Sequence, residues 1–298
     1  MVMRALPSSR AVAQTGIVQP MEKLRDFAQI VAEAQRGELV FPTSVNAALS
    51  LQMTLADPDC RDEDVIRKLL AEPVLAARAV ALANSAVFRS HGAALATGVR
   101  TAVMRLGYRN LYSLTAAMVV RQFGARIRDP HLRAQAEQLW KYSAHVAALA
   151  YVIARRITRV EPDTALFAGI LHEVGGFYLL GRADVMPGLL DDPEDWMGAA
   201  QEIVAREIMK KLQVPEPVAL AIVSLRGGAV GIPPEGLRDT LLVARHLCPV
   251  TSPLPQETDH LLGRTAALAG YLEQHPHIAA LLDEAGEQAK SMSAALLV

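Results

Sequence analysis

The stretch GILHEVGGFYLL, residues 169–180, sets a histidine beside a glutamate in a run that is otherwise apolar or glycine. Imidazole and carboxylate groups are common ligands of divalent metal ions in hydrolytic sites. The pair His172-Glu173 is therefore either half of a metal centre or the remnant of one. The answer depends on which other ligands the chain supplies.

Composition and periodicity predict an all-α protein. Of the 298 residues, 51% are hydrophobic, 5% aromatic and 20% charged, which is typical of a globular chain, and the abundant Ala and Leu favour helix. Apolar residues recur at helical spacing from Glu22 onwards, and no alternating pattern long enough for a β-strand stands out. The sequence therefore predicts about a dozen helices and almost no strand.

Charge and cysteine content exclude several classes of function. The formal net charge is -1 and the isoelectric point is about 6.7, so no overall positive field attracts nucleic acid. Cys60 and Cys248 are far apart and outside any CxxC motif, which excludes a thiolate zinc site and suits a reducing compartment. We expect a cytoplasmic protein that does not bind nucleic acid.

The sequence also predicts no membrane association. The first twenty residues have no apolar block of signal-peptide length. No segment is expected to reach the roughly 18 consecutive apolar residues of a membrane span. The longest dense apolar run, VAALAYVIA at residues 146–154, is closed by Arg155-Arg156.

Breaks in the helical pattern divide the chain into three parts. Residues 1–20 lack periodicity and contain prolines and serines, which predicts a mobile N-terminal arm. The charged, proline-bearing segment RIRDP, residues 126–130, predicts a boundary between a helical bundle at 21–128 and a second helical part at 129–298. In the second part, Pro162 is expected to start the helix that carries His172, and Gly175-Gly176 is expected to end or bend it.

Five fragments in a fixed order resemble one protein family. They are FPTSVNAALSLQ, EPVLAARAVALANSAVF, AVMRLGYRNLYSL, LWKYSAHVAALA and AGILHEVGGFYLL, within residues 37–226. This series is similar to the HDOD domain, an HD-related output domain of bacterial signalling proteins. The resemblance implies an N-terminal helical bundle packed on a helical core akin to HD-type phosphohydrolases, so residues 129–298 would form the HD-like core.

The resemblance also implies which positions a hydrolytic HD site would use. Such a site takes a histidine from one helix, a His-Asp pair from a second and an aspartate from a third. Tyr142 matches the first histidine, and His172-Glu173 matches the pair. A neutral phenol, with a pKa of about 10, is a poor metal ligand at pH 7. His145, one helical turn after Tyr142, is an alternative ligand.

No residue matches the last aspartate convincingly, and Arg226 stands where related domains often carry histidine. A positive charge there opposes metal binding. We therefore predict no bound metal and no cofactor. The favoured interpretation of His172 is a buried, hydrogen-bonded core histidine near a close helix contact at Gly169. Glu173 is expected to pair with Arg155, Arg156 or Arg182, or to be exposed.

Two further groups of residues are candidates for partner binding. Arg155, Arg156 and Arg159 predict a basic surface for an acidic partner or a phosphate, although solvated helix ends are the commoner explanation. Trp196 lies in the acidic segment DDPEDW and is a candidate anchor for a partner.

Three hypotheses on function follow. The leading one is a non-catalytic signalling or regulatory module with a degenerate HD metal site, which binds other signalling proteins. The second is a residual metal-dependent phosphohydrolase or phosphodiesterase that acts on nucleotides or cyclic dinucleotides through His145, His172 and Glu173. The third is a sensor that binds a small ligand, such as a nucleotide or cyclic dinucleotide, between the two helical parts without turning it over.

Overall fold

The protein is all-helical, as the composition predicts. The structure, a computed structural model, describes residues 26–39, 46–89, 93–191, 199–226, 230–255 and 261–297, and these ranges contain no β-strand. Residues 26–35 are helical. The helices that follow are α2 (Asn46–Ala56), α3 (Asp62–Leu70), α4 (Pro73–Ala83), α5 (Val99–Gly124), α6 (Pro130–Ile153), the π-helical turn η2 (Ala154–Thr158), α7 (Pro162–Leu171), α8 (Val174–Ala183), α10 (Ala199–Lys211), α11 (Glu216–Val223), α12 (Gly236–Leu247), α13 (Leu261–Gln274) and α14 (Pro276–Leu297).

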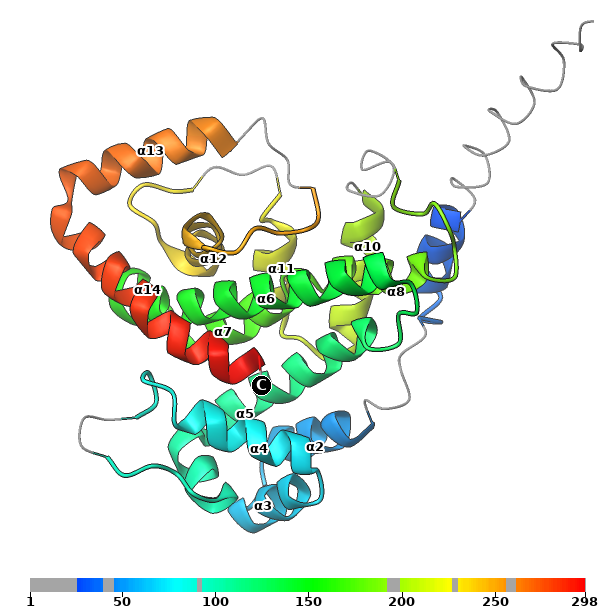
Figure 1. Ribbon diagram of the computed structural model, residues 1–298, viewed down its shortest axis with the longest axis horizontal. Coiled ribbons are helices and arrows are strands. Elements are labelled where there is room, and N and C mark those ends of the chain that lie inside the picture. The colour runs from blue at the N-terminus through cyan, green and yellow to red at the C-terminus, as the bar shows by residue number, and fades with distance from the viewer. Residues whose placement is uncertain are drawn as a thin grey trace, which may run out of the picture.

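The long helices α5 and α6 run through the middle of the molecule (Figure 1). Helix α6 packs against α7, α12 and α14, and α5 packs against α2, α4, α7 and α8. Buried side chains from both predicted parts of the chain join in one hydrophobic core. The division into parts at 21–128 and 129–298 stays a prediction, and the predicted arm at 1–20 lies outside the described residues.

Helix boundaries follow local chemistry. Proline occupies the first position of α4, α6 and α7, where its missing N–H costs no hydrogen bond. The Asp129 side chain accepts hydrogen bonds from the backbone N–H groups of His131 and Leu132, at 2.8 and 2.9 Å, and so caps α6. Within α5 the helix is interrupted at Gly107, whose φ of 70° suits glycine.

The break near His172 was predicted at the wrong residues. Helix α7 ends at Leu171 and α8 begins at Val174, so the interruption falls on His172-Glu173 and both glycines lie inside α8. The glycines instead admit close neighbours, since a methyl group on Gly175 would lie 2.9 Å from the carbonyl oxygen of Gln201.

Residues 162–183 are long and apolar enough for a membrane span by length and composition alone, with a mean hydropathy of 1.3 over an 18-residue window. However, 89% of that window is buried inside the protein, which is typical of a core segment of a soluble protein.

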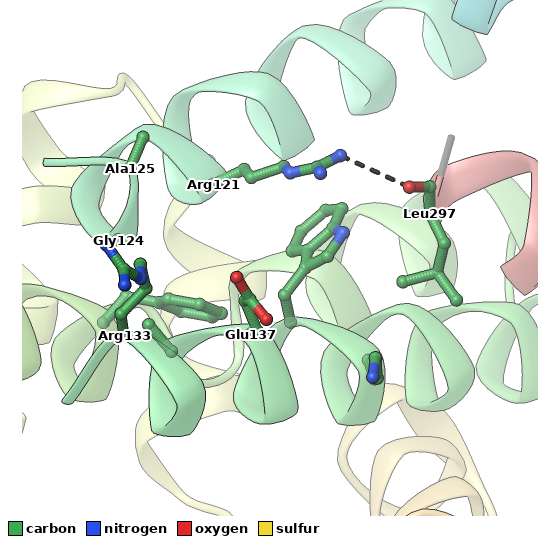
Figure 2. A pocket seen from close by; sticks show the side chains of 10 residues that line it. Arg121, Gly124, Ala125, Arg133, Glu137 and Leu297 are labelled. Atoms are coloured by element: carbon green, nitrogen blue, oxygen red, sulfur yellow. Dashed lines mark hydrogen bonds between the residues drawn. The ribbon is translucent and has the colours of Figure 1, made fainter. Parts of the chain in front are cut away.

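The last turn of helix α14 is held against α4 and α5. Its last turn accepts hydrogen bonds at the Leu296 oxygen from Arg78 (3.3 Å) and at the Leu297 oxygen from Arg121 (3.4 Å; Figure 2). These arginines belong to α4 and α5, and positive charge at a helix C-terminus is favourable. Burial and the charge of Arg121 lower the pKa of Arg78 to about 10.

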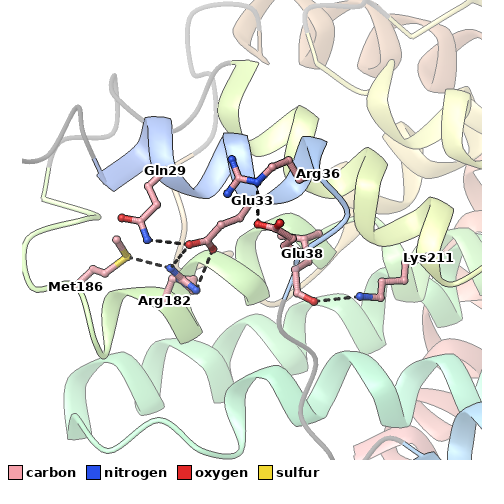
Figure 3. Close-up of polar contacts among 8 residues, drawn as sticks. Gln29, Glu33, Arg36, Glu38, Arg182, Met186 and Lys211 are labelled. Atoms are coloured by element: carbon pink, nitrogen blue, oxygen red, sulfur yellow. Dashed lines mark hydrogen bonds and ion pairs between the residues drawn. The ribbon is translucent and has the colours of Figure 1, made fainter.

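The helix at residues 26–35 and the residues that follow it are held against α8 and α10 (Figure 3). Glu33 pairs with Arg182 of α8 at 3.2 Å, and both side chains are mostly buried. Gln29 donates a hydrogen bond to Glu33 at 2.8 Å, and Lys211 of α10 donates to the Leu39 carbonyl at 3.1 Å. These contacts tie the start of the described chain to its middle.

Candidate functional site

His172 lies at the hinge between α7 and α8, and its side chain is fully buried. Its Nδ1 lies 2.7 Å from the carbonyl oxygen of Gly169, so Nδ1–H donates and the lone pair is on Nε2. Helix α7 packs tightly on α6 here, since a methyl group on Gly169 would lie 2.5 Å from the Ala147 Cα. The pKa of His172 falls to about 3, chiefly because of burial and also because of the Arg245 charge. His172 is thus a neutral, hydrogen-bonded core histidine.

Glu173 is buried beside His172. Its side chain is only 10% exposed, and its Oε1 lies 3.8 Å from His172 Nε2. Burial raises the pKa of this carboxyl, while the charges of Arg245 and Arg226 oppose that rise. The expectation of an exposed Glu173 was therefore wrong. The cations that act on it are Arg245 and Arg226 rather than the three arginines predicted from sequence.

Tyr142 and Arg245 complete the polar cluster. The Tyr142 ring lies 5.5 Å from the His172 ring, centroid to centroid, and is tilted by 53°. Arg245, in the last turn of α12, donates a hydrogen bond from Nε to the Tyr142 hydroxyl at 3.2 Å. Since α12 packs on α6, this guanidinium lies where its charge acts on both His172 and Glu173. We call His172, Glu173, Tyr142 and Arg245 the hinge cluster.

His145 does not join the hinge cluster. Its Nδ1 contacts the Lys141 carbonyl oxygen of its own helix at 2.9 Å. No group of three or more His, Cys, Asp or Glu side chains comes together anywhere in the described part of the chain. Only the His172 and Glu173 side chains offer suitable donors here, and two arginines act on Glu173. The residues present therefore do not fit the metal that a hydrolytic HD site would hold.

The three arginines of the predicted basic surface differ in their surroundings. Arg156 forms an ion pair with Glu284 of α14, so it helps to fix that helix. Arg155 and Arg159 are exposed at either end of η2, and a partner for them stays a prediction. Trp196 lies outside the described residues.

Arg245 is the residue of the hinge cluster that the sequence did not reveal. It lies in the last turn of an ordinary amphipathic helix, and nothing in the spacing connects it to His172. An arginine in the last turn of a helix is commonly explained by the helix dipole, so no local signal identifies it. Only the packing of α12 on α6 identifies Arg245 as part of the cluster.

These features are those of an all-helical protein of the HD-related type, in which a histidine and a carboxylate are adjacent between two helices. The chain belongs to the HDOD domain family, since the family model matches residues 41–222. No curated protein matches the sequence.

Solved structures share the fold. One, from Shewanella amazonensis and provisionally named a metal-dependent phosphohydrolase, is 18% identical with a TM-score of 0.68, and the match covers 92% of this chain and 99% of that one. An HDOD domain protein of unknown function from Geobacter sulfurreducens is 22% identical with a TM-score of 0.61, over 90% and 96% of the two chains. At this identity the likeness establishes the fold alone.

Proposed function

We propose that this chain is a non-catalytic regulatory module of bacterial signal transduction, which acts in the cytoplasm by binding other signalling proteins. The observation that carries the proposal is the hydrogen bond from Arg245 to Tyr142 beside the buried His172-Glu173 pair. The protein's own guanidinium supplies the positive charge that a metal ion would otherwise provide.

Access gives a second, independent argument. A hydrolytic metal needs a coordination position open to water and substrate. The His172 side chain has no exposed surface, and that of Glu173 has little. A phosphate ester could reach neither residue unless α7, α8 or α12 moved, so the hinge cluster supports the fold rather than turnover.

The test measures metal content and activity together. The protein, purified without a histidine tag, is analysed for Mn, Fe and Zn and assayed with bis(p-nitrophenyl) phosphate and cyclic dinucleotides. We expect substoichiometric metal and no turnover. Stoichiometric metal with turnover that is lost in His172→Asn would overturn the proposal, and circular dichroism of the variant confirms that it is folded.

Protein binding is tested separately. Partners captured from the native cells are purified and titrated against the folded protein by calorimetry. We expect saturable binding that EDTA does not change, because no metal takes part. Failure to capture any specific partner would count against the proposal that the chain acts by binding other proteins.

A further inference from the structure

A pocket of about 390 Å³ lies between the end of α5, the first half of α6 and the end of α14 (Figure 2). Its charged lining is Arg121 from α5 and Arg133, Glu137 and Lys141 from α6. Trp140 and Phe177 supply aromatic surface. This volume is at the lower end of the range for small-ligand sites, about 300–1,000 Å³.

The α6 side of the pocket is a row of charged residues. Arg133, Glu137 and Lys141 are spaced four residues apart and therefore share one face of the helix. All three are exposed, and none of them forms an ion pair with another residue in the described ranges. Figure 2 shows Arg133 and Glu137 pointing from α6 towards the α5 side of the pocket. With Arg121, the lining carries three positive charges and one negative charge.

The aromatic part is rigid and buried. Trp140 is only 5% exposed, and its ring packs edge to face with Phe177 at 6.4 Å between centroids. An aromatic surface beside cationic side chains suits a flat base joined to a phosphate, because bases stack on aromatic rings and arginine binds phosphate. The Glu137 carboxylate adds an acceptor for the N–H groups of a base.

This pocket is separate from the hinge cluster. Trp140 and Tyr142 are two residues apart in α6, so their side chains leave the helix about 200° apart. Trp140 lines the pocket, while Tyr142 contacts His172. The two sites therefore lie on opposite faces of one helix.

We propose that the pocket binds a nucleoside monophosphate, with the phosphate held by Arg121, Arg133 and Lys141 and the base placed against Trp140. The proposal goes beyond the regulatory function above and does not depend on it, because no residue is shared with the hinge cluster. Since Leu297 also lines the pocket, bound nucleotide would restrain the end of α14.

The test is isothermal titration calorimetry of the full chain with GMP and AMP, with guanosine and inorganic phosphate as partial ligands. We expect saturable binding of at least one nucleotide, at least tenfold tighter than binding of guanosine or phosphate. Red-edge tryptophan fluorescence of a Trp196→Phe variant locates the ligand, because Trp140 is then the single tryptophan in the chain.

Two charge-reversal variants test the phosphate-binding side chains, and a third serves as the control. Arg133→Glu and Lys141→Glu should each weaken nucleotide binding at least tenfold, whereas Lys210→Glu, an exposed lysine of α10, should leave it unchanged. No saturable binding, or equal binding by all three variants, would overturn the proposal. Guanosine binding as tightly as GMP would overturn it too. Metal content and turnover are not read in this experiment, so its failure is distinct from failure of the regulatory proposal.

Discussion

The polar side chains on the two faces of α6 differ in their burial. On the Tyr142 face, Tyr142, His172 and Glu173 are buried, Arg245 is half-buried, and the Arg245 charge acts on both His172 and Glu173. On the Trp140 face, Arg133, Glu137 and Lys141 are exposed around a pocket. The open, charged pocket thus lies on the other side of α6 from the buried His172-Glu173 pair.

The largest effect should come from breaking the close contact between α7 and α6 at Gly169. Gly169→Ala puts a methyl group 2.5 Å from the Ala147 Cα, a backbone atom that cannot rotate away. We expect a loss of about 3–4 kcal/mol in the free energy of unfolding, measured by urea denaturation. Gly286→Ala is the control, because its methyl group meets nothing within 4 Å. It should be neutral or stabilising by up to about 1 kcal/mol, and equal effects of the two substitutions would refute the packing explanation.

Removing the guanidinium of the hinge cluster should have the next largest effect. Arg245→Met leaves Glu173 buried beside fewer positive charges and removes the hydrogen bond to Tyr142. We expect a loss of about 2–3 kcal/mol in the free energy of unfolding. The double variant Arg245→Met/Glu173→Gln should recover at least about 1 kcal/mol, because a neutral amide needs no counter-charge. Additive losses would show that Arg245 does not compensate Glu173.

The pH dependence of stability should report the buried histidine. The pKa of His172 falls from 6.5 to about 3 on folding, so the unfolded state binds the proton first. Stability is therefore full above about pH 6.5 and is lost as the pH falls towards 3, by up to about 1.4 kcal/mol per pH unit. Glu173 acts in the opposite direction, because its raised pKa makes the folded state take up a proton first as the pH falls towards 4.5.

Denaturation at several pH values separates the two groups. Between pH 6.5 and 5, His172→Asn should lose about 2 kcal/mol less stability than the parent protein. Glu173→Gln should lose more than the parent, because the opposing contribution is gone. Identical slopes for all three proteins would show that neither group changes its proton affinity on folding.

The smallest effect on stability is expected for the exposed charged residues on the Trp140 face of α6. Arg133→Met removes an exposed charge without an ion-pair partner in the described ranges, so the free energy of unfolding should change by less than about 0.5 kcal/mol. A loss as large as that of Arg245→Met would mean that the row on α6 supports the fold. Thermal and chemical denaturation of both variants in one buffer make the comparison direct.

The helices could be predicted because their signals are local. Pro73 and Pro162 begin helices, Gly107 interrupts one, and Asp62, Glu63 and Asp64 lie in the first turn of α3. Burial of His172 and the close contact at Gly169 were also expected from the apolar run around them. Each of these features depends on residues within a few positions of one another.

Features set by distant packing could not be predicted. Gly175 and Gly176 looked like a helix break, but close approach of Gln201 and Leu254 explains them better. The contact of Arg245 with Tyr142 depends on how α12 crosses α6, which periodicity does not define. The pocket could not be predicted either, since Arg121 and Arg133 line it together only because the chain turns back between α5 and α6.

The ion pair between Glu33 and Arg182 has a consequence for synthesis of the chain. These residues are 149 positions apart, so the helix at 26–35 leaves the ribosome long before α8 exists. At about 5–20 residues per second the interval is roughly 7–30 s. During that time Phe27 and Ile30, buried in the finished protein, have no core to enter. This amphipathic segment therefore exposes apolar side chains that a chaperone can bind during that interval.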